Sequence, residues 1–203
     1  TDVEFKETPS AQRETMLQSD QVKMIFATYS ITDDRKKKVS FAGPYFIAGQ
    51  DLLVAAGNSD ITGPDSLNGK KLCSVKGSTS AKKIQDNFAN QVQLKEYDTY
   101  SKCVEALASG AVDAVTTDNV ILAGFAAQSQ YAGKFKVVGK TFSEERYGVG
   151  INQGDTKLCT AINAALEKMV SDGSWQKALD DTVGKSGFQV DTSVNPPKPD
   201  ACA

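Results

Sequence analysis

The sequence predicts an α/β protein, and three observations support that class. Short apolar runs bounded by turn residues, typical of strands, recur along the chain. Segments whose apolar residues recur at helical spacing separate these runs. The 203 residues are 40% hydrophobic, which is enough for one large core or two small ones. Because strands alternate with helices, we expect parallel sheets covered by helices.

Three elements are expected near the beginning of the chain. Residues 3–5 alternate apolar and charged side chains and are interpreted as a short strand. Ser10 is a favoured residue at a helix N-cap, so a helix is expected from there to about Ser19. Residues 22–27 are mostly apolar and are interpreted as a buried strand.

Strands and helices alternate through the middle of the chain. Apolar and β-branched runs predict strands at 51–55, 72–75, 93–97, 114–117 and 135–138. Helices are expected between them, near 79–90, 100–109 and 119–130. The stretch 57–70 is rich in glycine, aspartate and asparagine, so turns are expected there.

The last part of the chain predicts a strand, two helices and an extended tail. Residues 147–151 are the strand, and Asp155 is expected to cap the first helix. The apolar stripe of that helix consists of Leu158, Ala161, Ile162, Ala165, Leu166 and Met169. A second helix over 175–183 is expected to end at Gly184, a residue suited to the C′ position. Prolines keep 195–200 extended.

The segment 27–35 has the residues needed to bind a small carboxylate. Thr28 and Ser30 provide hydroxyls at a strand-to-helix corner, and Arg35 follows one turn later. A guanidinium presents a planar pair of donors that matches the two oxygens of a carboxylate. The alternative is an ordinary strand end followed by a solvated helix, since three lysines follow at 36–38.

Composition argues against several classes of function. The net charge of −2 provides no strong field for a nucleic acid or an anionic membrane. No apolar run reaches the length of about 18 residues that a membrane span needs. The sequence has no histidine, which removes the commonest general base and the commonest metal ligand.

The four cysteines are Cys73, Cys103, Cys159 and Cys202, and none forms a C-x-x-C pair. A zinc ribbon is therefore not expected, and neither a metal nor a cofactor is predicted. Four cysteines allow three disulfide pairings, and four buried thiols in a cytosolic protein are the alternative. Cys202 argues against buried thiols because a polar tail offers no core. Disulfides, and hence an oxidising extracytoplasmic setting, are expected.

Four segments resemble, in order, the signature of the extracellular amino-acid-binding proteins that feed ABC importers, the family 3 solute-binding proteins. The segments are A-T-Y-S-I-T-D-D-R-K-K-K-V-S-F-A-G-P-Y (27–45), L-N-G-K-K-L-C-S-V-K-G-S-T-S (67–80), A-L-A-S-G-A-V-D-A-V-T-T-D (106–118) and Y-G-V-G-I (147–151). Each motif alone is weak, but the ordered set covers almost the whole chain. Within the family, the sequence most resembles glutamate-binding proteins of Gram-positive glutamate uptake systems.

The resemblance implies a two-lobed, periplasmic-binding-protein-like (type II) fold with a two-stranded hinge. Residues 1–50 and 148–203 would form lobe 1, and residues 51–147 would form lobe 2. Family members usually carry a strand and a long helix ahead of the equivalent of Val3. Both are absent from this sequence. Lobe 1 is therefore expected to lack its N-terminal strand, and to be loosened or repaired by domain swapping with a neighbouring chain.

The expected lobes also favour one disulfide pairing. Cys73–Cys103 and Cys159–Cys202 would each stay inside one lobe. A bridge between the lobes would obstruct the hinge.

The resemblance further implies that a free amino acid binds between the lobes. Arg35 would bind its α-carboxylate, with Thr28 and Ser30 in support. Ser78 and Thr79 lie where a helix begins on the opposite lobe, so they would add donors for the same anion. A plain helix cap is the alternative role for these two residues.

Four more residues are candidates for contact with the ligand. Asp118 would hold the ammonium group, although it is also suited to be a helix N-cap. Lys76 would face the ligand side chain and favour a distal carboxylate or amide over a cationic group, unless it is a surface lysine. Tyr45 would pack on the ligand or on the hinge, and Arg146 would be a second side-chain contact.

These inferences predict a binding protein rather than an enzyme. It would bind L-glutamate, or else glutamine or aspartate, and deliver it to the permease subunits of an ABC uptake system. We expect it at the outer face of the cell membrane as a lipoprotein, or in the periplasm, with a lipid anchor that this chain lacks. The alternatives are a receptor's sensor domain, a non-binding relic, or a dehydratase-like enzyme using Glu144, Glu145 or Asp118.

Overall fold

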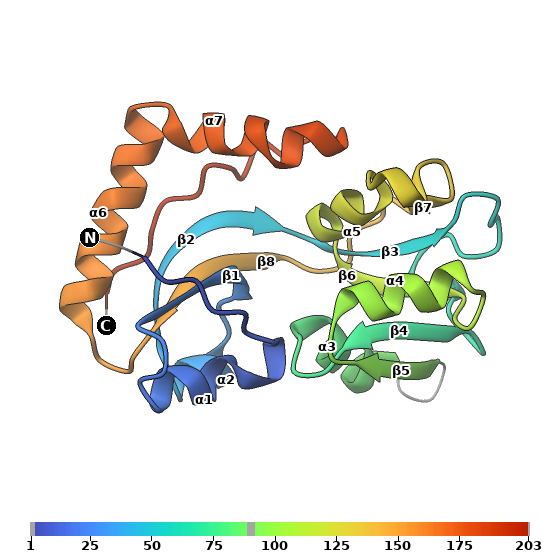
Figure 1. Cartoon of the computed structure of the whole chain (residues 1–203), viewed down its shortest axis with the longest axis horizontal. Coiled ribbons are helices and arrows are strands. Elements are labelled where there is room, and N and C mark those ends of the chain that lie inside the picture. Colours follow the sequence, from blue (N-terminus) through green and yellow to red (C-terminus); the bar gives the residue numbers. More distant parts are fainter. Residues whose placement is uncertain (1–2, 89–91, 203) are drawn as a thin grey trace.

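A computed structural model describes residues 3–88 and 92–202, and two β-sheets lie side by side in it (Figure 1). The first sheet has the strand order β1 (Met24–Ser30), β8 (Glu145–Ile151) and β2 (Ser40–Ala48). The second sheet has the order β5 (Gln93–Tyr97), β4 (Lys71–Val75), β6 (Ala114–Asp118), β3 (Gln50–Ala55) and β7 (Phe135–Val137). The chain is therefore a mixed α/β protein, as predicted.

The helices divide between the two sheets in the same way (Figure 1). Those beside the first sheet are α1 (Arg13–Gln18), α2 (Asp33–Lys36), α6 (Thr156–Ser171) and α7 (Ser174–Asp181). Those beside the second sheet are α3 (Thr79–Phe88), α4 (Tyr100–Ala108) and α5 (Asn119–Ala126). Among the residues that the structure describes, no helix is both long enough and apolar enough to cross a bilayer.

The chain passes between the sheets at two neighbouring places. Gly49 alone separates β2 from β3, and the β2 residue Ala48 pairs with Glu145 at the start of β8. A Cβ at Gly49 would lie 2.7 Å from side-chain carbons of Thr141, so a larger residue does not fit without a shift. The two crossings are thus narrow and adjacent, which is the geometry of a two-stranded connection.

Among the strands that the structure describes, only β5, β4 and β6 pair in parallel. The expectation of parallel sheets is wrong for the rest, because β3 pairs antiparallel with β6 and β7, and β8 pairs antiparallel with β1 and β2. Strand β3 continues from β2 into the second sheet, and β8 returns to the first sheet. Both are antiparallel to their neighbours. Alternation of strands and helices alone did not reveal those crossings.

The second sheet is buried on both faces. Leu52 and Leu53 are adjacent in β3, so they point to opposite faces, and neither is exposed to solvent. Leu53 belongs to a cluster with Val115 and Leu122, whereas Leu52 packs in a separate cluster with Leu72 and Ile84. Helices on both faces exclude water from this sheet, which makes it a firm support for the loops at its edge.

Several predicted elements are confirmed, and three details are wrong. Residues 3–9 form neither helix nor strand, and Phe5 is 93% exposed, because no described strand lies alongside to complete a ladder. Ser10 does not cap the first helix. A 3₁₀ turn, η1 (Ser10–Gln12), begins at Ser10 itself and leads into α1. Gly184 lies inside the 3₁₀ turn η4 (Val183–Ser186), and Gly187 adopts the left-handed conformation instead.

Strand β2 was not predicted, because Gly43 and Pro44 interrupt its apolar pattern. Proline cannot donate a ladder hydrogen bond, so within sheets it occurs at edges and bulges. β2 is an edge strand, and its pairing with β8 shifts register between Ala42 and Phe46. The bulge accommodates the Gly-Pro pair and lets one strand continue on both sides of it.

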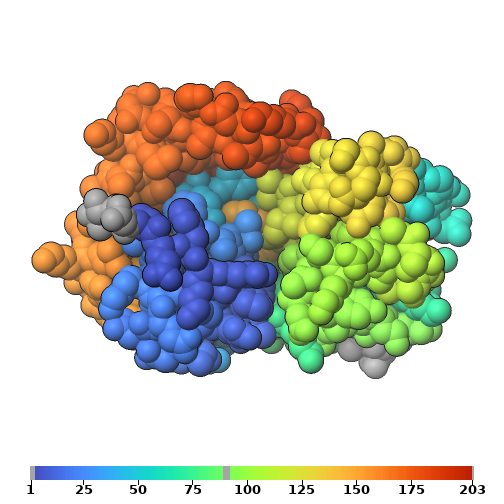
Figure 2. All heavy atoms as spheres, viewed as in Figure 1, coloured from blue at the N-terminus to red at the C-terminus, as the bar shows by residue number. Residues whose placement is uncertain are grey.

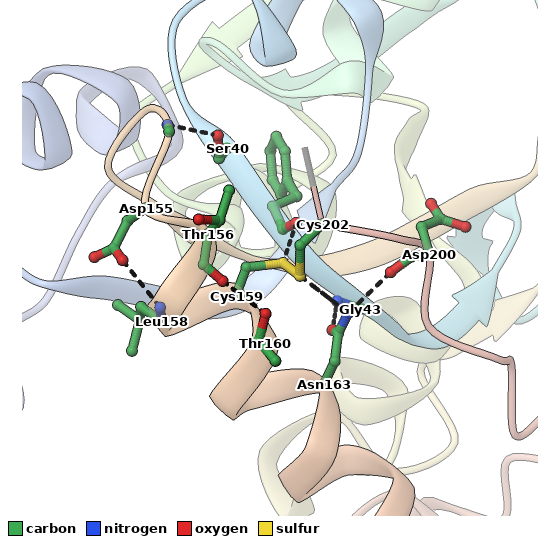
Figure 3. Close-up of a disulfide and its surroundings, with 12 residues drawn as sticks. Ser40, Gly43, Asp155, Thr156, Leu158, Cys159, Thr160, Asn163, Asp200 and Cys202 are labelled. Carbon is green, nitrogen blue, oxygen red and sulfur yellow. Dashed lines mark hydrogen bonds between the residues drawn. A yellow bond between two sulfur atoms is a disulfide. The ribbon is translucent and has the colours of Figure 1, made fainter.

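The C-terminal tail covers the open edge of β2. The Asn195 side chain accepts a hydrogen bond from the Ile47 amide (2.8 Å) and donates one to the Ile47 carbonyl (3.0 Å). Asp200 donates its amide to the Gly43 carbonyl at 2.7 Å. Asn163 joins both partners, accepting from the Gly43 amide and donating to the Asp200 carbonyl, each at 2.8 Å (Figure 3). These bonds satisfy backbone groups that an edge strand otherwise exposes.

Two disulfides join Cys73 to Cys103 and Cys159 to Cys202, which is the pairing favoured from the sequence. The first ties β4 to α4 inside the second sheet's core. The second ties α6 to the tail (Figure 3). Each bridge therefore closes a loop without crossing from one sheet to the other.

Replacing Cys159 and Cys202 together with serine should lower the free energy of unfolding by about 4 kcal/mol, because the bridge spans 43 residues and restricts the unfolded chain. Urea titration measures the change, with the oxidised parent chain as control. Amide exchange at Gly43 and Ile47 should accelerate, since both amides bond to groups that the bridge holds in place. An unchanged urea midpoint would contradict the proposed role of the bridge.

Candidate functional site

Arg35 is the centre of the candidate site. Its side chain comes from α2, whose N-cap Thr32 accepts a hydrogen bond from the Arg35 amide at 3.2 Å. Although charged, Arg35 is only 8% exposed. One terminal nitrogen donates to the Ser30 carbonyl (2.7 Å) and the other to the Gly77 carbonyl (3.1 Å). Nε lies 3.4 Å from the Glu14 carboxylate. Since a guanidinium has five N–H groups, two remain for a further partner.

The Arg35–Gly77 hydrogen bond joins the two halves of the molecule. Gly77 lies in the loop after β4 and has φ +74°. A Cβ there would lie 2.7 Å from Cα of Ala11, so the loop rests directly on the backbone of η1. Figure 2 shows the blue N-terminal segment in contact with the green surface that includes α4. The structure therefore has its two halves closed against each other at this point.

The loop also prepares the beginning of α3. Ser78 accepts a hydrogen bond from the Ala81 amide (3.0 Å) and donates one to the Val75 carbonyl (2.7 Å), so it caps the helix. Thr79 is the first residue of α3. Both residues line a small chamber of about 20 Å³, which has room for about one water molecule. The chamber lining consists of Ser10, Arg13, Thr28, Arg35, Ser78, Thr79, Tyr100 and Ile121.

A wider groove opens beside the chamber. Its volume is about 460 Å³, and its walls come from α1 with η1, from α2, and from α3 with the preceding loop. Arg35, Ser78 and Thr79 line both spaces. The groove is therefore the solvent side of the same site.

Asp118 is a buried carboxylate at the end of β6. Its Oδ2 accepts a hydrogen bond from the Tyr147 hydroxyl (2.5 Å), whereas Oδ1 has no hydrogen-bond partner among the described residues. Burial, followed by the nearby Glu145 carboxylate, raises the pKa of Asp118 to about 7, while the Tyr147 hydrogen bond and Arg35 act to lower it. Asp118 occupies the N-cap position of α5 but makes no capping hydrogen bond. Its free oxygen is suited to a cationic partner.

The remaining first-sheet candidates have supporting roles. Thr28 has φ 46°, which is uncommon for a β-branched residue, and it donates its amide to the Tyr45 hydroxyl (3.2 Å). Tyr45 stacks on Phe26 with ring centroids 4.3 Å apart and does not line the chamber. Ser30 contributes its carbonyl to Arg35. The structure thus brings Thr28 to the chamber and gives Tyr45 a packing role.

Lys76 and Arg146 lie away from the chamber. Lys76 is exposed and lines neither the chamber nor the groove. Arg146 forms an ion pair with Asp200 at 2.8 Å, on the side of the first sheet that the tail covers. Among the described residues, no side-chain hydrogen bond or ion pair joins Lys76 or Arg146 to the other candidates, so their roles toward a ligand stay predictions from the resemblance.

Sequence reasoning missed Arg13. Its guanidinium carbon lies 5.1 Å from the centroid of the Tyr29 ring, and that of Arg35 lies 4.8 Å from the same centroid. Arg13 precedes the buried residues Met16 and Leu17 by three and four positions, so all three share one helix face. The sequence signal for Arg13 is a cationic residue at helical spacing from the apolar residues Met16 and Leu17.

The arrangement is suited to binding rather than to a reaction. A buried guanidinium with free donors and a buried carboxylate with a free acceptor can each bind the opposite charge of a zwitterion. Of the acids proposed for an enzyme, Glu145 accepts a hydrogen bond from the Ser143 hydroxyl (2.7 Å), and Glu144 lines a different cavity beside Gln189. These acids do not converge on the chamber.

Known proteins resemble this chain over most of its length. A model of the family "Bacterial extracellular solute-binding proteins, family 3" matches residues 1–185. "Glutamate-binding protein GluB" from Corynebacterium efficiens is 51% identical over 194 residues, which is 93% of this chain and 65% of that protein. "ABC transporter glutamine-binding protein GlnH" from Bacillus subtilis is 42% identical over 175 residues, 86% of this chain and 62% of that protein.

A solved structure described as an ancestral arginine-binding protein bound to glutamine superposes with a TM-score of 0.82. It is 39% identical, and the match covers 89% of this chain and 80% of that one. The chain spans a little under two thirds of the length of the two curated relatives. With a family model that matches most of its residues and close relatives that are binding proteins, this chain belongs to the bacterial extracellular solute-binding proteins of family 3.

Proposed function

We propose that the chain binds a free α-amino acid, most favourably L-glutamate, at the Arg35 site. One observation carries the proposal: Arg35 retains free donors, Asp118 retains a free acceptor, and the Arg35 charge is near enough to act to lower the pKa of Asp118. Arg35 then binds the α-carboxylate, and Asp118 binds the ammonium. Thr28, Ser78 and Thr79 add hydroxyl and backbone groups from both sides. The names of the relatives, glutamate-binding and glutamine-binding, support an acidic or amide ligand.

The binding mechanism that we propose is closure of two lobes on the ligand. Residues 1–50 and 148–203 form one lobe, and residues 51–147 form the other. In the closed structure the chamber holds about one water molecule, so an amino acid enters only when the walls separate. The narrow crossing at Gly49 is where the chain bends. Because each lobe carries part of the ligand's partners, binding favours the closed state.

The same proposal extends to the transporter. As the solute-binding component of an ABC uptake system, the chain presents its closed form to the permease subunits. Two disulfides support an oxidising site of action outside the cytoplasm. The proposal includes attachment of the protein to the outer face of the cell membrane through a lipid anchor. Strand exchange with a second copy also stays a prediction, and the exposure of Met24 and Phe26 on β1 is compatible with it.

Calorimetric titration with L-glutamate, L-glutamine, L-aspartate and L-arginine tests the function. Replacing Arg35 with alanine should weaken glutamate binding by about 3 kcal/mol or more, because the ligand carboxylate loses its buried partner. Lys37→Ala is a matched control, since Lys37 is an exposed cation on the same short segment. Glutamate affinity equal to that of the parent in Arg35→Ala would remove Arg35 from the site. Failure of the parent to bind any of the four would reject the proposed function.

Asp118 should make both stability and binding depend on pH. Its pKa in the folded ligand-free chain, about 7, lies above the ordinary value of 3.8, so folding takes up a proton between these values. Its contribution to stability is therefore lost as pH rises from about 4 to 7. Glutamate affinity should rise over the upper part of that range and level off above pH 7, because the ammonium needs the carboxylate form.

Asp118→Asn isolates this effect. The variant should lose most glutamate affinity at pH 8, yet unfold at a higher temperature than the ligand-free parent there, with a smaller gain at pH 5. Calorimetric titration and thermal unfolding at the two pH values measure these changes. Parent affinity that stays constant between pH 5.5 and pH 8 would contradict the role of Asp118.

Gly77→Ala should hinder closure. The added Cβ would lie 2.7 Å from Cα of Ala11, so the loop cannot approach η1 as closely. Gly69→Ala is the control, because Gly69 has nearly the same φ, +73°, with no neighbouring heavy atom within 4 Å. Both variants carry the cost of a left-handed alanine, about 1 kcal/mol. Only Gly77→Ala should reduce glutamate affinity, by about tenfold or more, and equal affinities would exclude this contact from closure.

A further inference from the structure

Two buried side-chain oxygens lie on neighbouring strands at the edge of the second sheet. Gln50 and Asp118 are direct partners in the antiparallel ladder of β3 and β6, so their side chains project from the same face. The Cβ atoms of such partners are about 4.5–5.5 Å apart. Gln50 is fully buried, and Asp118 is 4% exposed. Gln50 Oε1 and Asp118 Oδ1 each lack a hydrogen-bond donor among the residues that the structure describes.

The neighbours of Gln50 determine which end of its amide is left over. Nε2 lies 2.9 Å from the Thr116 hydroxyl and 3.3 Å from the Ser80 carbonyl. The Thr116 hydroxyl donates its hydrogen to the Asp51 carbonyl at 3.0 Å, so it can only accept from Gln50. The Ser80 carbonyl is also only an acceptor. Both neighbours therefore require the NH₂ end of the amide, and the oxygen faces elsewhere.

The backbone of Gln50 is held as firmly as its side chain. Its amide donates to the Ser143 hydroxyl at 3.1 Å, and its carbonyl accepts from the Phe142 amide at 3.0 Å. Ser143 and Phe142 belong to the segment that leads into β8, and Gly49, where the chain crosses, directly precedes Gln50. Because both crossings fix this residue, a donor for Oε1 has to come to it.

The hydrogen bonds around Gln50 continue to the chamber. Ser74 donates its hydroxyl to the Thr116 carbonyl at 3.0 Å, and its oxygen lies 3.4 Å from the hydroxyl oxygen of Ser78. Ser78 lines the chamber, and Ser80 lies in the first turn of the helix that follows. Gln50 is thus part of the layer of side chains that supports the ligand-binding loop.

Two neighbouring acceptors without donors indicate the kind of group that binds there. A buried acceptor without a donor is costly, and native proteins seldom keep one without a reason. One of the two oxygens belongs to a carboxylate, so a cation with several N–H groups is the most favourable partner. A primary ammonium has three N–H donors. One can bond to Asp118 and another to Gln50.

We propose that Gln50 is a second residue that binds the ligand ammonium: its Oε1 accepts one N–H while Asp118 Oδ1 accepts another. This inference rests on the proposed function and adds a residue that selects for a primary ammonium. An N-alkylated amino acid has fewer N–H groups and leaves one of these acceptors without a donor. The amide is neutral, so it adds an acceptor without a second negative charge beside Asp118.

A supporting role for Gln50 is the competing explanation. In that case Gln50 only holds the Ser80 carbonyl and the Thr116 hydroxyl, and Oε1 binds a water molecule. Thr116→Val separates the two roles, because it removes an acceptor of Nε2 and leaves Oε1 in place. A supporting role predicts similar losses of affinity in Thr116→Val and Gln50→Leu. The proposed contact predicts a large loss in Gln50→Leu alone.

Calorimetric titration with L-glutamate at pH 8 compares the parent with these two variants. Gln50→Leu should lower the affinity by roughly 10- to 100-fold and Thr116→Val by less than about threefold, as expected when one hydrogen bond to a charged group is lost. Thermal unfolding without ligand shows whether each variant folds. Gln50→Asn, which withdraws the amide by one methylene, repeats the test if Gln50→Leu does not fold.

A crystal structure of the parent with L-glutamate provides a second measurement that no supporting role would satisfy. The ammonium nitrogen should lie within about 3.2 Å of Gln50 Oε1. That distance, together with a selective loss in the Gln50 variant, supports the inference.

Three results would overturn the inference and leave the proposed function standing. They are equal losses in the Gln50 and Thr116 variants, parent affinity in the Gln50 variant, and a water molecule between the ammonium and Oε1. A parent chain that does not bind glutamate rejects the proposed function itself, and with it the contact to Gln50.

Discussion

Arg35 is a permanent charge held almost out of water, and much of the structure around it serves its hydrogen bonds. Thr32 caps the short helix that carries it, and the end of β1 presents the Ser30 carbonyl to it. On the other side, a glycine lets the loop after β4 come near enough to offer a second carbonyl. A buried guanidinium with too few acceptors would destabilise the fold. The contact between the two halves is therefore a requirement of this charge as well as a result of packing.

Asp118, unlike Arg35, is a buried charge with few hydrogen-bond partners. Its carboxylate has one hydrogen bond from Tyr147, and burial together with the nearby Glu145 carboxylate raises its pKa. An asparagine would be easier to bury at this position. The ammonium of the proposed ligand is the kind of partner that makes this buried charge favourable. Such tension between stability and binding is common at functional sites.

The local pattern of apolar residues was sufficient to predict much of the secondary structure. Apolar runs located β4, β5 and β6, and the stripe after Asp155 located α6, because these elements obey a simple period. Strand β2 was not predicted because its bulge and its proline hide the alternation of apolar and polar residues. The antiparallel pairings were not predicted because they depend on where the chain crosses between the sheets. Arg35 and Asp118 were identified through a resemblance and lie as buried charges in one region. Arg13 was passed over because an arginine in a helix is usually solvated, and only tertiary structure reveals which way it faces.

The disulfide between Cys159 and Cys202 strengthens the contact of the tail with β2 by tethering the tail. Asn195 and Asp200 each make hydrogen bonds to the edge of β2, and such bonds are individually weak in water. The bridge from Cys202 to α6 holds the tail at a high local concentration beside that edge, on the order of millimolar or above for a short tether. Weak bonds then stay formed most of the time. Before the thiols are oxidised, the same segment lacks this tether, so the bridge favours coverage of the β2 edge.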